Sequence, residues 1–213
     1  MINKVFNKLK WFVAYLKKHL LRRRRYFMNP QKFWNKVGAK STFEDYPDYI
    51  QRSQEKFFKK IDSELKPSSV LEVGCGHGRL LKIFGDRGAG VDFGESQIER
   101  AKNAGLNVVL ADAMKLPFPD NSFDIVYTNC VLMHILPKHI DEVRNEIIRV
   151  SKKWILHCEA LNITPIMFGY NHAEWYRNVA QKKKLRVVRE VYNPFLRKNL
   201  HKRVQVILVE KNK

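Results

Sequence analysis

The chain has 213 residues, of which 45% are hydrophobic and 12% aromatic. This length and composition predict one domain with a packed core and exclude global disorder. The net charge of +19 is extreme, so we expect an anionic partner such as nucleic acid, a membrane surface or an acidic substrate. The three cysteines, Cys75, Cys130 and Cys158, lack paired spacing, which predicts neither a disulfide framework nor a metal site and favours a reducing, cytoplasmic location.

The basic residues are concentrated at the two ends. Residues 1–43 hold 12 Lys or Arg and no acid, and residues 177–213 hold another 12 against two glutamates. The middle of the chain is nearly neutral, so the charge belongs to the flanks. No stretch approaches the roughly 20 apolar residues that a membrane span needs, and no secretory signal is evident.

Residues 1–28 are predicted to form a basic amphipathic helical segment. Apolar side chains over residues 2–21 recur every three or four positions, and Arg22–Arg25 follow directly. This pattern is typical of a helix that lies in an anionic membrane interface, so we expect peripheral membrane association. A helix packed on the protein's own domain and a mitochondrial presequence are the alternatives.

Residues 29–66 are expected to be a helical lid or linker. Asn29-Pro30 is interpreted as a break, and a helix is predicted over about 47–65, ending before Pro67. Tyr46 and Tyr49 lie at the start of this helix and are candidates to contact a substrate.

Residues 67–213 are predicted to form an α/β domain with a Rossmann-like, doubly wound, mostly parallel seven-stranded sheet. Helical segments of 10–15 residues separate most of the strands, which is the pattern of parallel crossovers. No helix separates the last two strands, and Asn193-Pro194 fits the start of a hairpin connection, so the last strand is expected to be antiparallel. The expected strands are 69–73, 88–92, 107–111, 123–129, 153–159, 185–192 and 203–209, and the expected helices are 78–84, 95–104, 138–150 and 172–184.

A glycine-rich turn follows the first expected strand. Gly74, Gly76 and Gly78 come directly after Val70–Val73. Glycines let the backbone turn tightly and approach a ligand, and the helix start beyond them presents free N–H groups. Glu72 precedes the first glycine by two residues, where its carboxylate would attract a cationic group. The G-x-G-x-G spacing, together with this acid, favours S-adenosylmethionine over a dinucleotide.

Polar residues close the next three strands. Asp92 ends the second strand, 18 residues after Gly74, where an acid binds both hydroxyls of a ribose. Asp112 ends the third strand and would accept a hydrogen bond from an adenine amino group. Asn129 ends the fourth strand, at the sheet edge where open α/β sheets hold their ligands.

Together these motifs resemble the class I S-adenosylmethionine-dependent methyltransferase superfamily, and most closely its type 11 small-molecule branch, over residues 65–192. The resemblance implies an enzyme with S-adenosylmethionine over the carboxyl edge of the sheet. Gly94 departs from the Ser or Thr that usually caps the second helix, which weakens the cap slightly. The residues implied to contact the cofactor are Glu72, Gly74, Gly76, Gly78, Asp92, Phe93, Asp112, Ala113 and Asn129.

The candidate catalytic residue is His134, which follows the fourth strand near the expected methyl group. An oxygen or nitrogen acceptor needs a base, and a histidine capping or packing the loop is the alternative. Glu159, Tyr170 and His172 lie at or after the end of the fifth strand and are candidates to contact the acceptor.

The sequence leaves three functions open. The first is methyl transfer to an oxygen or nitrogen of a small-molecule, glycan or lipid-linked acceptor, at a membrane surface. The second is an RNA methyltransferase whose basic ends bind phosphates, although no RNA-binding module is recognisable. The third is a binding protein that keeps the fold without turnover. The sequence predicts neither the acceptor atom nor the oligomeric state.

Overall fold

The computed structural model describes residues 29–39, 48–161, 168–192 and 204–212. The expected helix over 2–21, Arg22–Arg25 and Tyr46 lie outside these residues, so the structure does not test the predictions made for them. Within the described part of the chain, no helix combines the length and the apolarity that crossing a membrane requires.

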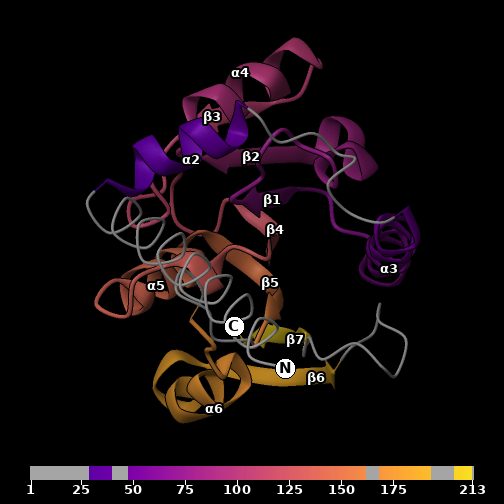
Figure 1. Ribbon diagram of the computed structural model, residues 1–213. Coiled ribbons are helices and arrows are strands. Elements are labelled where there is room, and N and C mark those ends of the chain that lie inside the picture. The colour runs from indigo at the N-terminus through magenta and orange to yellow at the C-terminus, as the bar shows by residue number, and fades with distance from the viewer. Residues whose placement is uncertain (1–28, 40–47, 162–167, 193–203, 213) are drawn as a thin grey trace, which may run out of the picture.

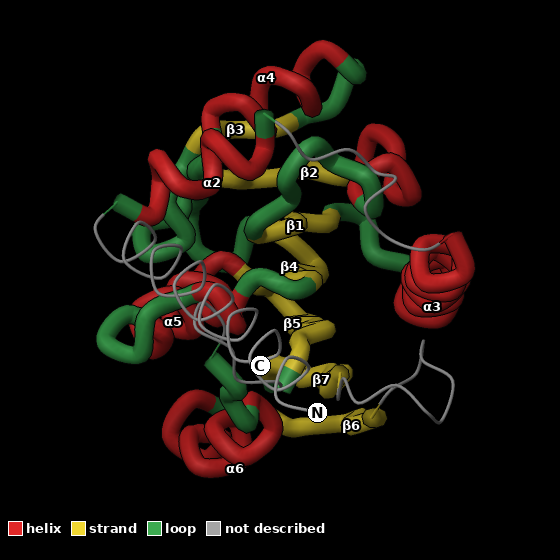
Figure 2. The backbone as a smooth tube through the Cα atoms, in the orientation of Figure 1, coloured by secondary structure: helices red, strands yellow, loops and turns green. Residues whose placement is uncertain are grey.

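Seven strands form one sheet in the order β3-β2-β1-β4-β5-β7-β6 (Figures 1 and 2). The strands from β1 to β5 pair in parallel, while β7 pairs antiparallel to both β5 and β6. The predicted Rossmann-like sheet with an antiparallel last strand is therefore confirmed. The strands are β1 Val70–Val73, β2 Gly88–Asp92, β3 Val108–Leu110, β4 Phe123–Asn129, β5 Ser151–Ala160, β6 Leu185–Tyr192 and β7 Val204–Lys211.

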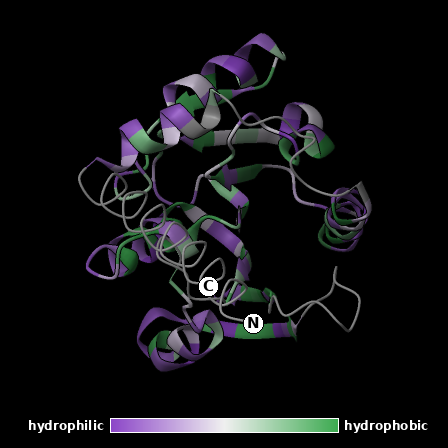
Figure 3. Ribbon diagram, in the orientation of Figure 1, coloured by the Kyte–Doolittle hydropathy of each residue, from purple (hydrophilic) through white to green (hydrophobic). Residues whose placement is uncertain are grey.

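Hydrophobic side chains on the two faces of the sheet form separate cores, because neighbouring residues of a strand point to opposite faces. Val70 packs with one core and Leu71 with the other, and the same alternation holds for Val206 and Ile207. Figure 3 shows green, hydrophobic segments along the strands, interrupted by hydrophilic ones. Burial on both faces explains why central strands contain short apolar runs, such as Ile125–Tyr127 in β4.

The helices divide between the two faces. α5 (Ile140–Val150) and α6 (His172–Lys183) pack into one core, whereas α3 (Asp48–Leu65) and the 3₁₀ helix η2 (Leu81–Arg87) pack into the other. Figure 1 shows α3 on the opposite side of the sheet from α5 and α6. α4 (Glu95–Asn103) packs against β2 and β3 near one edge of the sheet.

Two predicted elements differ from the structure. The helix expected over 78–84 is the later 3₁₀ helix η2, which is interrupted at Gly85 with φ +55°. Asn29-Pro30, interpreted as a break, instead starts α2 (Pro30–Gly38). Asn29 Oδ1 accepts a hydrogen bond from the Lys32 N–H at 2.8 Å, and proline fits the first position of a helix because the N–H it lacks has no partner there.

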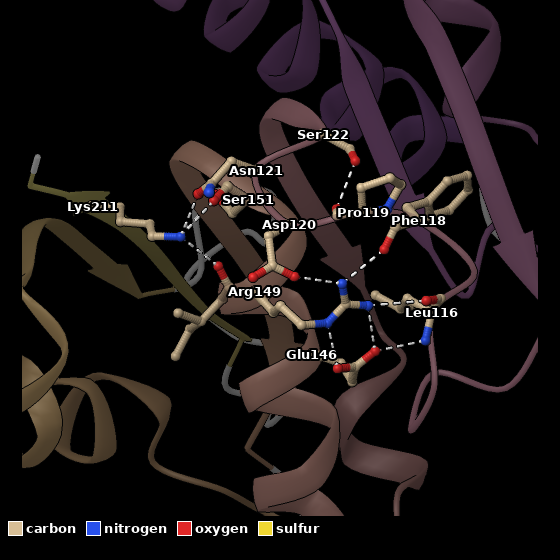
Figure 4. A network of polar contacts seen from close by, with 11 residues as sticks. Leu116, Phe118, Pro119, Asp120, Asn121, Ser122, Glu146, Arg149, Ser151 and Lys211 are labelled. Atoms are coloured by element: carbon tan, nitrogen blue, oxygen red, sulfur yellow. Dashed lines mark hydrogen bonds and ion pairs between the residues drawn. The ribbon is translucent and has the colours of Figure 1, made fainter.

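Arg149, in the last turn of α5, holds the loop that leads into β4 (Figure 4). Its guanidinium donates to both carboxylate oxygens of Glu146, at 2.7 and 2.8 Å, and to Asp120 Oδ1 at 2.9 Å. It also donates to the carbonyl oxygens of Leu116 and Phe118, at 3.0 and 2.7 Å. All five N–H donors of the arginine are used, so this one side chain ties the loop to α5.

We expect Arg149→Ala to lower the free energy of unfolding by about 2–4 kcal/mol, because it removes the Arg149 donors from Glu146, Asp120 and two loop carbonyls. Urea denaturation measures this change. The matched control is Arg186→Ala, which removes an arginine whose side chain is 65% exposed and pairs with Glu210; its cost should stay below about 1 kcal/mol. Equal costs for the two variants would contradict the role assigned to Arg149.

Candidate functional site

The glycine-rich turn after β1 adopts a backbone that favours glycine. Gly74, Gly76 and Gly78 have φ values of +73°, +54° and +81°, in the left-handed region that residues with a Cβ rarely adopt. A Cβ on Gly74 would lie 2.4 Å from Val131 Cγ2, and one on Gly78 would lie 2.1 Å from Leu106 Cδ1. These two glycines therefore allow the close packing of the turn, while Gly76 lines an open space.

Asp92, at the end of β2, holds this turn in place. Its Oδ2 accepts the Gly76 N–H at 2.9 Å and its Oδ1 accepts the Gly94 N–H at 2.8 Å. Burial raises the pKa of Asp92, while these backbone hydrogen bonds act in the opposite direction. Each carboxylate oxygen has a second lone pair, so Asp92 has acceptor capacity left for a ligand hydroxyl.

A cavity of about 640 Å³ opens over the carboxyl ends of β1 to β4. The volume is in the range of small-molecule and cofactor sites. Most of the residues predicted from sequence meet there: the lining includes Gly74, Gly76, Asp92, Phe93, Asp112, Ala113, Asn129 and His134. The topology explains this gathering, since the carboxyl ends of parallel strands share one edge of the sheet.

Other predicted residues lie outside the cavity lining. Gly78 packs against Leu106 beneath the turn, and Tyr49 is 43% exposed at the start of α3. Glu72 is buried at 4% exposure, and burial raises its pKa to about 8, with Tyr127 and Arg79 lowering it in part. A direct contact of Glu72 with the cofactor stays a prediction, but its position is under the turn.

The three candidate acceptor contacts after β5 have structural partners instead. Glu159 is fully buried and accepts a hydrogen bond from Thr128 Oγ1 at 2.7 Å. Tyr170 donates its hydroxyl hydrogen to the Ile135 carbonyl oxygen at 2.7 Å. His172 is 1% exposed and lies 3.2 Å from Arg144 through its Nδ1 atom. None of the three is among the cavity-lining residues, and a contact of any of them with an acceptor stays a prediction.

A cavity-lining side chain that sequence reasoning missed is Trp34 of α2. Trp34, Gln31 and Asn29 line the cavity, and the Trp34 ring lies edge-on to His134 with centroids 4.7 Å apart. Gln31 Nε2 donates to the Phe93 carbonyl oxygen at 3.2 Å, and Ser96 Oγ donates to the Asn35 carbonyl oxygen at 2.9 Å. The Asn-Pro capping signal could have revealed this helix, but nothing local places it over the cavity.

Asn129 is held from the other side by α3. Gln54 Nε2 donates to Asn129 Oδ1 at 3.4 Å, and Arg79 donates to Gln54 Oε1. Cys130, the next residue, lines the cavity in a left-handed conformation with φ +58°. The end of β4 is thus positioned by contacts with α3 and with the first residues after the glycine turn.

Comparison with known proteins agrees with this geometry. Residues 71–154 match the family model of a methyltransferase domain. Over these residues the chain is similar to S-adenosylmethionine-dependent methyltransferases, as its motifs predict, and the match supports S-adenosylmethionine as the cofactor.

Relatives by sequence act on unlike acceptors, to judge by their names. The chain is 39% identical over 101 residues to a sterol 24-C-methyltransferase of Gibberella zeae, 33% over 129 residues to a fatty-acid O-methyltransferase of Mycolicibacterium smegmatis, and 32% over 103 residues to a probable tRNA methyltransferase 9B of Mus musculus. The matches cover 41%, 55% and 46% of this chain and only 26%, 44% and 23% of those proteins. They leave the acceptor open.

Solved structures share the fold. A magnesium protoporphyrin IX methyltransferase of Synechocystis PCC 6803, solved with bound S-adenosylmethionine, has a TM-score of 0.62 at 12% identity and covers 89% of this chain and 95% of its own. A methyltransferase of Leishmania major has a TM-score of 0.65 at 16% identity, with coverage of 84% and 85%. At these identities the likeness shows the fold alone.

We expect Gly74→Ala to lower both stability and S-adenosylhomocysteine affinity, because the new methyl group would meet Val131 at 2.4 Å. Gly105→Ala is the matched control: Gly105 also has a positive φ, +75°, but has no atom within 4 Å of its Cβ position. Both variants bear the backbone strain of about 1 kcal/mol, and Gly74→Ala should cost at least another 1 kcal/mol for overpacking.

Urea denaturation and calorimetric titration measure the two effects. Val131→Ala added to Gly74→Ala should restore part of the loss. Equal behaviour of the Gly74 and Gly105 variants would show that close packing on Val131 does not matter.

Proposed function

We propose that this protein transfers the methyl group of S-adenosylmethionine to an oxygen or nitrogen of a small-molecule, glycan or lipid-linked acceptor. The observation that carries the proposal is a single cavity lined both by the glycine turn with Asp92 and by His134 with Trp34. The glycine turn and Asp92 fit a nucleoside that carries a charged side chain. His134 and Trp34 line the part of the cavity that is left for an acceptor.

The residues of the cavity fit the cofactor. Gly76 has no atom nearer than 3.9 Å to its Cβ position, so the turn leaves room for a ligand beside its backbone. Asp92 keeps acceptor capacity for the two ribose hydroxyls. Asp112 accepts the Met114 N–H through Oδ1 at 2.9 Å, which orients the carboxylate at the end of β3 for an adenine amino group. Bound S-adenosylmethionine supplies a methyl group on a positively charged sulfur, which is a reactive donor.

The chain's own residues would do three things in the reaction. The turn and the two aspartates hold the donor, so that the acceptor meets it in a defined geometry, which is a large source of rate. His134 takes the proton of an acceptor hydroxyl or amine at a ring nitrogen. Trp34, from α2, covers His134 and limits access of water to this part of the cavity.

The lining beyond the cofactor residues favours an apolar acceptor. Met114, Ile135 and Leu136 belong to it together with Trp34, and Lys138 adds a positive charge at its exposed side. Among the residues that the structure describes, Asp92 and Asp112 are the only acidic residues that line the cavity. This composition supports a small apolar or lipid-linked acceptor, with or without an anionic group, and fits the names of the sterol and fatty-acid relatives.

The membrane surface and RNA remain proposals about the flanks. The amphipathic pattern of residues 1–28 supports docking on an anionic membrane, which would bring the cavity near lipid-linked acceptors. The high density of basic residues at both ends, together with the likeness to a probable tRNA methyltransferase, supports RNA as the second candidate. A binding protein without turnover is the third, and the shape of the cavity with its histidine argues against it.

Radiolabelled methyl transfer into a fractionated lysate separates these candidates. With the full-length protein and labelled S-adenosylmethionine, we expect label in the lipid or small-molecule pool. Label in the RNA pool would move the proposal to the second candidate, and no label in any pool would support the third.

We expect Asp92→Ala to weaken S-adenosylhomocysteine binding by about 1–3 kcal/mol, since it removes the acceptor of the ribose hydroxyls and of the Gly76 N–H. Calorimetry measures the affinity, and Asp86→Ala, at an exposed carboxylate outside the cavity lining, is the control. An affinity unchanged in Asp92→Ala would show that the ribose is bound elsewhere.

We expect His134→Ala to lower turnover by about 10²–10⁴-fold while S-adenosylhomocysteine affinity stays within about threefold, as for loss of a general base. Initial rates of label transfer to the labelled pool give the first quantity, and calorimetry gives the second. A parallel loss of both, or a fall in the unfolding midpoint, would assign His134 a structural role.

A further inference from the structure

The residue proposed as the base stands on a short turn. The 3₁₀ helix η3 (Leu132–His134) begins three residues after the end of β4, and its first two residues, Leu132 and Met133, are buried. The His134 N–H bonds to the Val131 carbonyl oxygen at 2.9 Å. The position of the His134 ring in the cavity therefore depends on how this one turn is held.

The backbone N–H groups at the start of a helical turn have no partner within the turn, and a carboxylate is a favourable partner for them. The residue before η3, Val131, has no side chain that could act as a cap. Glu159, at the end of the neighbouring strand β5, takes this place. Its Oε1 accepts the Val131 N–H at 3.1 Å and its Oε2 accepts the Met133 N–H at 3.3 Å.

A buried polar chain holds Glu159 itself. Thr128 Oγ1 donates to Glu159 Oε1 at 2.7 Å and lies 2.8 Å from His157 Nδ1. His157 Nε2 lies 2.8 Å from the Tyr176 hydroxyl oxygen on α6. Burial lowers the pKa of His157 to about 3, so its ring is neutral. With Thr128 donating to Glu159, the ring donates its Nδ1–H to Thr128 and accepts the Tyr176 hydroxyl hydrogen.

The same turn has two backbone anchors. The Cys130 N–H bonds to the Cys158 carbonyl oxygen at 2.8 Å, and the Phe168 N–H bonds to the Met133 carbonyl oxygen at 2.6 Å. Glu159 is the buried carboxylate of this arrangement and contacts the turn through both of its oxygens. A buried group with several well-aligned hydrogen bonds holds its neighbours strongly, because each broken bond would leave a polar group unpaired.

We propose that Glu159 is a positioning residue: its carboxylate caps η3 from β5 and so sets where His134 stands in the cavity. The inference rests on the proposed function for the meaning of His134, but the placement of the ring can be measured without any turnover. Glu159 is not among the residues that line the cavity, so its proposed effect on His134 acts through the turn.

The test measures the position of the His134 ring through its contact with the Trp34 ring. In nuclear magnetic resonance spectra, the Trp34 ring current shifts the His134 Hε1 resonance. The size of this effect is the difference in the Hε1 chemical shift between the unmodified protein and its Trp34→Leu variant. The His134 resonance is assigned by its loss in His134→Gln. We expect Glu159→Gln to remove roughly half or more of this shift, since an amide has only one acceptor oxygen and leaves an N–H of the turn unpaired.

Glu64→Gln is the matched control, because Glu64 lies on α3 and pairs with Arg189 at the surface. It should leave the His134 resonance unchanged. S-adenosylhomocysteine affinity should stay within about threefold in Glu159→Gln, and kcat for the labelled transfer should fall at least about tenfold with little change in KM. Added to His134→Ala, the Glu159→Gln substitution should lower kcat no further.

An unchanged His134 resonance in a folded Glu159→Gln variant overturns the inference. Should that variant fail to fold, Thr128→Val decides, because it removes one donor to Glu159 without a change of volume; a shift in the same direction supports the inference and no shift overturns it. A normal turnover of His134→Ala, combined with a displaced resonance in Glu159→Gln, would refute the proposed base while leaving the positioning role of Glu159 intact.

Discussion

The parallel pairing of β1 with both β2 and β4 is the constraint on which the site depends. It brings the carboxyl ends of these strands to one edge, where Gly74 follows β1 and where Asp92 and Asn129 end β2 and β4, all three lining one cavity. A shift of one residue in either register would move the side chains of the shifted strand from one core to the other. The two hydrophobic cores that enforce the register therefore also assemble the cavity.

Close approach of two loops completes this assembly. The turn after β1 packs on Val131, so the loop after β4 can stand against it only because Gly74 has no side chain. Asp92 joins the same arrangement from β2 by accepting the Gly76 and Gly94 amides. A carboxylate that holds the loops around a cavity gives a preorganised site, since little has to move when a ligand binds.

Buried ionisable groups beneath the cavity extend the same principle. Burial raises the pKa of Glu72 to about 8 and that of Glu159 to about 7, so the folded state binds these protons more tightly than the unfolded chain. Their contribution to stability is full below the unfolded pKa of about 4.5 and is lost as the pH rises through 7 and 8. Burying these two carboxyl groups therefore lowers stability at higher pH, a cost that is tolerated where the groups order the loops of a site.

Much of this could be predicted from sequence, because it is encoded locally. Apolar runs and their spacing predicted the seven strands and the parallel sheet, and the glycine turn with Asp92, Asp112 and Asn129 predicted the cofactor edge. The remaining residues needed the tertiary structure. Trp34 comes to His134 only because α2 packs beside α4, and Glu159 accepts the Val131 N–H only because β5 lies next to β4. Periodicity and motifs report the conformation of a segment, whereas which segments meet is decided by packing across the whole fold.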